Sequence, residues 1–192
     1  MQSDLLEQQL TREERLALKN KRTGLTIFQI SWIMVFVSLV VVNWQLRFSQ
    51  LDWPPPGVDP APVIPATLAS LALIASVVLA RRAVKNLLNG DEAAFIKGWP
   101  WAIGLGAVFT VIMLYEWLAL PYTGIYSDVF RMMTGFHVIH ALVVGALMVS
   151  VYRSARAGEL QPVNYWYAEG TTSMWVFVLV AWILFYVVLY WV

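Results

Sequence analysis

Five stretches of this 192-residue chain are long and apolar enough to cross a lipid bilayer, and this feature restricts the fold more than any other. A bilayer-crossing helix needs about 20 mostly apolar residues. Backbone N–H and C=O groups must be paired inside lipid, which excludes an open sheet and favours helices. The sequence therefore predicts an all-α integral membrane protein with five transmembrane helices.

The limits of these helices follow from the charged residues between them, once caps and turns are trimmed. The predicted helices cover residues 24–46, 62–82, 98–121, 126–152 and 171–192, in one transmembrane domain over 24–192. Residues 1–23 are polar and mixed in charge, and they lack the short apolar run of a signal peptide. We expect them to form a cytosolic extension with a short amphipathic helix around 13–17.

Composition narrows the classes of function. Hydrophobic residues make up 59% of the chain and charged residues 13%, whereas about a quarter of an average soluble domain is charged. A net charge of +1 does not favour a nucleic-acid partner. The chain has no cysteine, which excludes disulfides, Cys-ligated zinc and iron–sulfur clusters.

The distribution of basic residues predicts the orientation. Every Lys and Arg except Arg47 and Arg131 falls in the N-terminal extension, the second–third connection or the fourth–fifth connection. Cytoplasmic segments carry the excess of positive charge, so the N-terminus is expected inside and the C-terminus outside. Tryptophans, which favour the lipid–water interface, are expected near the span ends at Trp44, Trp53, Trp99, Trp101, Trp117, Trp166 and Trp191.

Ionisable residues at membrane depth are costly and are therefore candidate functional residues. Three are expected there: Glu116, His137 and His140. The two histidines lie one turn apart on the fourth helix, and the similar depth of Glu116 predicts that it pairs with His137, directly or through water. Hydrogen bonding between neighbouring helices is one role for these groups, and proton movement or lipid contact is another.

The sequence offers a candidate lipid site but no candidate metal or haem site. Two histidines three positions apart cannot take the opposite axial positions of one haem, and the chain has no third histidine. Arg81 and Arg82 lie at the expected inner interface, where arginine binds anionic lipid phosphates. Topology signalling is the alternative role for this pair.

A series of motifs runs in one order from residue 53 to the end of the chain. Its members are the loop 53–57, Leu105-Gly106 with Phe109, Glu116-Trp117, the turn 124–127, Thr134-Gly135-Phe136-His137 with His140, then Glu169, Trp175 with Phe177, Trp182 and Tyr190-Trp191. The series resembles the third subunit of haem–copper terminal oxidases, whose signature is Thr-Gly-Phe-His-x-x-His. The resemblance covers the C-terminal five helices of the family's long form, as in short bacterial members.

The resemblance implies a non-catalytic subunit of a respiratory oxidase in the bacterial plasma membrane, supporting aerobic electron transport and proton translocation. It implies no cofactor held by this chain, with haem and copper in partner subunits. The implied partners are the catalytic subunit I, a subunit II, further small subunits and structural phospholipids. Implied roles are to stabilise the catalytic subunit, to hold lipids and to support proton uptake.

The chain also departs from the family pattern. Trp32 stands where the family usually has a buried glutamate, and Val176 and Leu179 replace a histidine and an aspartate of the last helix. Dependence of proton uptake on these positions is therefore not expected. Two alternatives stay open: an accessory subunit of a quinol oxidase or nitric oxide reductase, and, in a different class, a small transporter or assembly factor.

Overall fold

The computed structural model describes residues 10–120, 124–160 and 165–191, and within them the chain forms five long helices. These are α2 (Arg12–Phe48), α3 (Val63–Leu88), α4 (Glu92–Ala119), α5 (Ile125–Arg156) and α6 (Trp166–Tyr190). Each is long and apolar enough to cross a membrane, which confirms the predicted fold class. Residues 1–9 of the predicted extension and the predicted helix ends at 121 and 192 lie outside the described residues.

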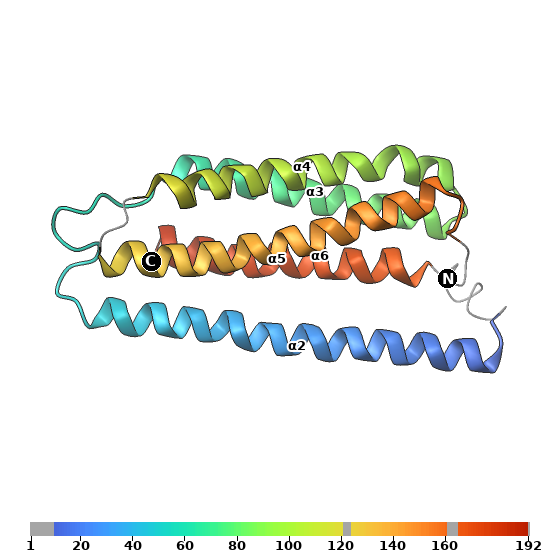
Figure 1. Cartoon of the computed structure of the whole chain (residues 1–192), viewed down its shortest axis with the longest axis horizontal. Helices are drawn as coiled ribbons and strands as arrows, with labels where there is room; N and C mark the ends of the chain where they lie inside the picture. The colour runs from blue at the N-terminus through green and yellow to red at the C-terminus, as the bar shows by residue number, and fades with distance from the viewer. Residues whose placement is uncertain (1–9, 121–123, 161–164, 192) are drawn as a thin grey trace.

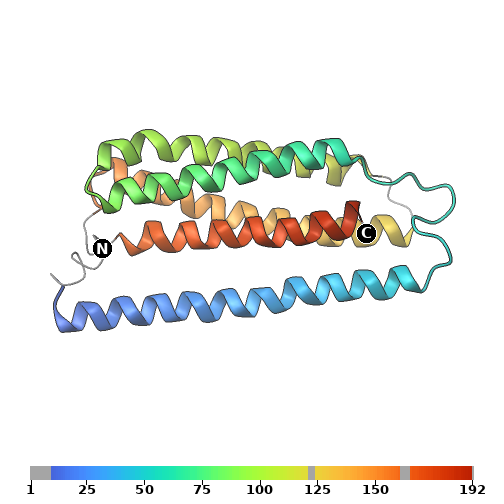
Figure 2. The ribbon, with the colours of Figure 1, turned by 180° about the vertical axis from the view of Figure 1, so that it is seen from behind.

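The helices run up and down, each antiparallel to the one before it (Figure 1). Helices α3, α4, α5 and α6 form a four-helix bundle in which α3 and α4 share the most extensive interface. Helix α2 lies along one side of this bundle, mainly against α6 and to a smaller extent against α5 (Figure 2). The chain is therefore a closed bundle with one lateral helix.

The helices extend further than predicted at their basic ends, where polar side chains cap the starts of α2 and α4. Thr11 and Glu14 form a capping box at the start of α2, so residues 13–17 are the first turns of this helix and not a separate one. Asp91 caps α4 through the Ala94 amide at 2.8 Å. Pro100 therefore lies inside α4.

The interior of the bundle is formed by large aromatic residues packed against small ones. Trp99, Trp175 and Trp182 are among the largest fully buried side chains. Trp99 does not present a solvated indole N–H as expected, because its ring is buried and its Nε1–H donates to the Met148 carbonyl at 2.8 Å. This bond joins α4 to α5 in the core.

Candidate functional site

Glu116, on α4, is 3% exposed and joins this helix to α6. The Tyr190 hydroxyl donates to its Oε2 at 2.6 Å, while Oε1 has no hydrogen-bond partner among the described residues. The expected direct bond between Glu116 and His137 is therefore not formed, and their pairing through water stays a prediction. Similar depth in two neighbouring helices does not establish which faces they present, and Tyr190 from a third helix takes the carboxyl group.

His137, on α5, is fully buried at the centre of the molecule. Its Nε2 lies 2.9 Å from the carbonyl oxygen of Val178 on α6. A carbonyl only accepts, so this nitrogen carries the proton, and Nδ1 has no partner in the described structure. The ring contacts Phe36 of α2, Phe109 of α4 and Trp182 of α6, with centroid separations of 6.0, 5.7 and 5.4 Å. One side chain thus connects α5 to three other helices.

His140 lies one turn further along α5, at the contact with α2. Its ring is 4.9 Å from Trp32, 5.6 Å from Phe36 and 5.5 Å from Phe177, measured between centroids. Trp32 also packs on Phe136 at 5.5 Å. The indole at this position therefore fills the space between α2 and α5 with an apolar aromatic contact.

The rest of the Thr-Gly-Phe-His motif serves close packing. The Thr134 hydroxyl is buried and donates to the Phe130 carbonyl of its own helix at 2.7 Å. A Cβ at Gly135 would lie 2.8 Å from the indole Nε1 of Trp117, which is closer than two such atoms can approach. Only glycine lets α5 come this near to the end of α4.

Arg131 is a buried polar residue that the sequence patterns did not indicate. It is 8% exposed, and its guanidinium donates to the carbonyls of Trp117 and Leu120 at the end of α4. A cation there satisfies carbonyls that the helix leaves unpaired and complements the helix dipole. In return, the Trp117 indole donates to the Arg131 carbonyl at 2.9 Å. The only available signal was a basic residue on the side otherwise poor in positive charge.

Indole N–H groups of α6 bind serine hydroxyls of α3. Trp182 donates to Ser70 at 2.8 Å, and Trp175 donates to Ser76 at 2.9 Å. The Ser76 hydroxyl donates in turn to the Ala102 carbonyl of α4 at 2.6 Å, so that three helices are joined at one point. The family-motif residue Trp182 is thus an interhelical contact, like His137.

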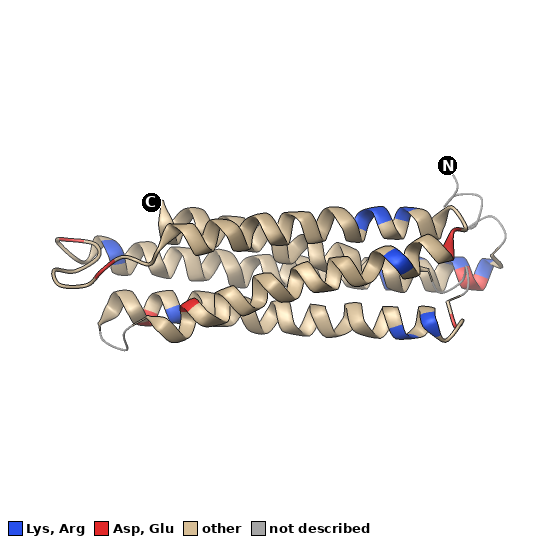
Figure 3. Ribbon diagram, turned by 90° about the horizontal axis from the view of Figure 1, so that it is seen from above, with Lys and Arg blue, Asp and Glu red and all other residues tan. Residues whose placement is uncertain are grey.

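In contrast to these buried contacts, the end of the molecule where α2 begins is charged and rich in Lys and Arg (Figure 3). Arg22 of α2 forms an ion pair with Glu169 of α6 at 3.2 Å, and Arg81 and Arg82 are exposed at the end of α3. Tyr165, just before α6, donates to Glu92 at 3.2 Å. Burial is the main cause that raises the pKa of the Tyr165 phenol, and the hydrogen bond to the Glu92 carboxylate raises this pKa further.

The comparisons with known proteins agree with these motifs. The family model for cytochrome c oxidase subunit III matches residues 7–192. The chain belongs to this family. It is 31% identical over 173 residues to cytochrome c oxidase subunit 3 of Thermostichus vulcanus, covering 87% of this chain and 85% of the relative. It is 29% identical over 185 residues to the subunit of Papio hamadryas, covering 90% of this chain and 70% of the relative.

As a subunit III, the chain is a multi-pass membrane component of a respiratory oxidase complex. The described residues contain no group of three or more His, Cys, Asp or Glu side chains that could hold a metal ion. Its buried polar residues join helices: Glu116 to α6, His137 to α6 and Trp182 to α3. The candidate site is therefore a set of interhelical contacts in the membrane core.

Proposed function

We propose that this subunit stabilises the catalytic subunit I of the oxidase, which holds the haem and copper, in a complex with a subunit II and further small subunits. The observation that carries this proposal is the use of the family motif. His137, Gly135 and Trp182 each make a close contact with another helix of the chain. Side chains engaged in this way maintain the shape of the bundle, and a bundle of constant shape can support a neighbouring subunit.

We further propose that the basic end of the bundle faces the cytoplasm, so that the N-terminus is inside and the C-terminus outside. Among the described residues, Lys and Arg concentrate at this end, and only Arg47 and Arg131 lie near the other (Figure 3). Positive charge is retained on the cytoplasmic side of membrane proteins. Because the chain has no native cysteine, a single cysteine in place of Ser154 or of Ser49 tests this directly.

In membrane vesicles of known sidedness, a membrane-impermeant maleimide should label the cysteine at 154 only from the cytoplasmic side. The cysteine at 49 should be labelled only from the external side. The reverse pattern would overturn the orientation.

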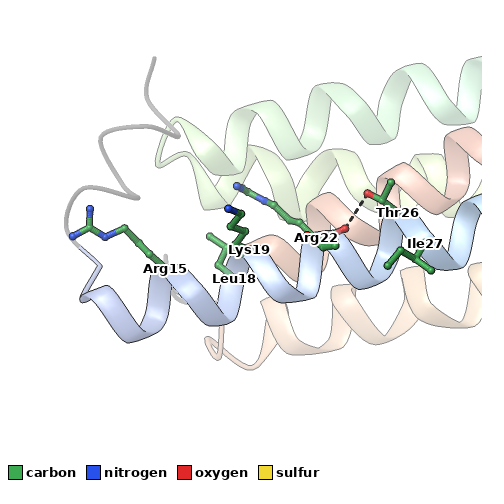
Figure 4. A pocket seen from close by; sticks show the side chains of 7 residues that line it. Arg15, Leu18, Lys19, Arg22, Thr26 and Ile27 are labelled. Atoms are coloured by element: carbon green, nitrogen blue, oxygen red, sulfur yellow. Dashed lines mark hydrogen bonds between the residues drawn. The ribbon is translucent and has the colours of Figure 1, made fainter.

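Holding structural phospholipids is a second part of the proposed role. A hollow of about 490 Å³ on one side of α2 is lined by the basic side chains of Arg15, Lys19 and Arg22 (Figure 4). Exposed Arg81 and Arg82 lie at the same end of the molecule. Clusters of Lys and Arg next to a transmembrane helix attract anionic lipids, at about 1 kcal/mol for each basic residue.

The support of proton uptake is proposed to be indirect. Trp32, Val176 and Leu179 carry no ionisable group where the family has an acid, a histidine and an aspartate. The subunit would then act by keeping subunit I and the lipids around its proton entry in place. On this basis, loss of the whole subunit lowers proton uptake, whereas substitutions among these three residues do not.

Purification through a tag on this chain tests the main proposal. The chain should migrate with a haem-containing complex in blue-native electrophoresis, and the optical spectrum of that complex should show the haems of an oxidase. A complex that oxidises quinol, or one that reduces nitric oxide, would contradict a cytochrome c oxidase. Migration of the chain free of any haem protein would point instead to a transporter or assembly factor.

A further inference from the structure

A hollow of about 430 Å³ lies between the basic end of α3 and the start of α6. Its α3 wall carries Arg81 and Lys85, one helical turn apart. Neither side chain forms an ion pair or hydrogen bond with another described residue. Two unneutralised cations on one helix face provide a binding position for a single phosphodiester group.

The α6 wall of this hollow carries an acid and a buried hydroxyl. Glu169 lines the hollow, and its side chain keeps 29% exposure although Oε2 is paired with Arg22. Thr172, one turn beyond Glu169 on α6, is 7% exposed, and its Oγ1 has no partner among the described residues. Threonine in a helix commonly donates to the carbonyl four residues earlier. Thr172 itself lines the hollow, so its hydroxyl is a donor there that the described residues leave unused.

The wall of the hollow changes from polar to apolar as it enters the membrane. Val84 and Leu88 of α3 and Val176 of α6 complete the lining. Val176 lies two turns along α6 from Glu169, on the side of the transmembrane core. This arrangement suits a ligand with a charged head and hydrocarbon chains better than a free ion.

The hollow on α2 differs in one respect that determines which head group each would take. The α2 hollow is lined by Arg15, Lys19, Arg22, Thr23 and Thr26 and has no carboxylate in its lining, although Glu169 is paired with Arg22 from outside it (Figure 4). The hollow between α3 and α6 has a carboxylate opposite its cations. The first therefore suits a purely anionic head group, and the second suits a head group that carries both charges.

We propose that the hollow between α3 and α6 binds an amine-bearing phospholipid of the phosphatidylethanolamine type. The phosphodiester lies between Arg81 and Lys85 with Thr172 as a further donor, and the ammonium group donates to Glu169. The acyl chains pass over Val176 into the bilayer. This inference rests on the proposed lipid-holding role and on the cytoplasmic placement of this end.

Photoactivatable lipids on the intact, purified oxidase test this inference. Phosphatidylethanolamine and phosphatidylglycerol probes with identical acyl chains are cross-linked, and labelled peptides that contain Val84, Leu88 or Val176 are quantified by mass spectrometry. One charge-assisted hydrogen bond to Glu169 predicts about a tenfold preference for the ethanolamine probe. Equal labelling, or a preference for the glycerol probe, would overturn the inference.

Matched variants separate the contributions of the charges. Glu169→Gln should abolish the preference between the two probes, whereas Arg22→Gln breaks the same ion pair but keeps Glu169 and should retain it. The double variant R81Q/K85Q should lower the labelling by both probes about tenfold. A preference that survives Glu169→Gln would contradict the placement of the ammonium group.

Two controls separate this inference from its alternatives. An excess of inorganic phosphate should not prevent labelling; if it does, the hollow binds free phosphate and the lipid assignment is wrong. The haem that copurifies with the tagged chain should stay at the wild-type level in every variant. Failure of the lipid assignment alone leaves this haem level unchanged, whereas a chain that purifies without haem refutes the proposed function instead.

Discussion

Helix α2 and the bundle of α3–α6 share a similar apolar composition but differ in how they are held. In the most apolar window of α2, 11% of the residues are buried, against 33–44% in the other four helices. The bundle is joined by buried hydrogen bonds such as Trp182 to Ser70 and Tyr190 to Glu116. Helix α2 is attached to the bundle by an exposed ion pair between Arg22 and Glu169 and by a hydrogen bond from Gln29 to Ser173 at 3.1 Å. Aromatic contacts such as Trp32 with His140 complete the attachment.

The difference shows what holds helices together where hydrophobicity cannot. Lipid tails are as apolar as leucine, so transmembrane helices associate through close packing and interhelical hydrogen bonds. The bundle has close packing, as between Gly106 and Trp175, and interhelical hydrogen bonds, as from the Trp175 indole to the Ser76 hydroxyl. Most of the surface of α2 lacks both and stays available to lipid or to another subunit. Substitutions should therefore be costly in the bundle and mild on α2.

Gly106→Ala should have the largest effect. Its Cβ would lie 2.5 Å from Cζ2 of Trp175, a buried ring held by its bond to Ser76. Overpacking of this kind costs about 1–3 kcal/mol. The matched control is Gly104→Ala in the same helix, where a Cβ meets no atom within 4 Å. Thermal dissociation of the subunit from the detergent-solubilised oxidase measures both, and equal midpoints would refute the close-packing argument.

His137→Leu should also weaken the bundle. It removes the bond to the Val178 carbonyl, and interhelical hydrogen bonds in membranes are worth about 0.6–1.7 kcal/mol. His140→Leu is the comparison, because His140 contacts α2 through ring packing and its Nε2 has no bonding partner in the described residues. Subunit retention after a detergent wash should fall more for the first variant. A greater loss for the second would make α2 the critical attachment.

Tyr190→Phe should destabilise the subunit by leaving both oxygens of the buried Glu116 without a described partner. A buried polar group deprived of its partner costs about 1–3 kcal/mol. Tyr186→Phe removes a similar hydroxyl, but its partner Thr67 still donates to the Val63 carbonyl. The first substitution should lower the thermal midpoint more, and the double variant Y190F/E116L should recover part of the loss. Equal effects of Tyr190→Phe and Tyr186→Phe would contradict the role of Glu116.

Trp32→Phe should have the smallest effect, since it lies on the lateral helix. Phenylalanine keeps an aromatic contact with Phe136 and His140, and no bond from the indole N–H to a described residue is lost. Oxygen consumption and proton pumping in liposomes should stay near the wild-type values. A large fall in pumping with the complex intact would show that α2 contributes more than packing.

The positions of the five spans and the family motif could be read from the chain, because helices in lipid satisfy their backbone within one segment. Glu116, His137 and His140, which the sequence singled out, are all buried, whereas the equally buried Arg131 was not expected. Their partners were not predictable: Glu116 bonds Tyr190, 74 positions away, and His137 bonds Val178, 41 positions away. The position of a residue in the sequence specifies how far along its helix the side chain lies, but not which neighbouring helix it faces.

Residue order and apolarity therefore determined that the chain has five helices able to cross a membrane and to which family it belongs. The tertiary packing alone decided that Trp99 is a core residue, that Arg131 caps α4 and that α2 lies beside the bundle. The reason is physical. Apolarity drives each helix into lipid one at a time, whereas rotation and partner choice depend on contacts between helices that are distant in the chain.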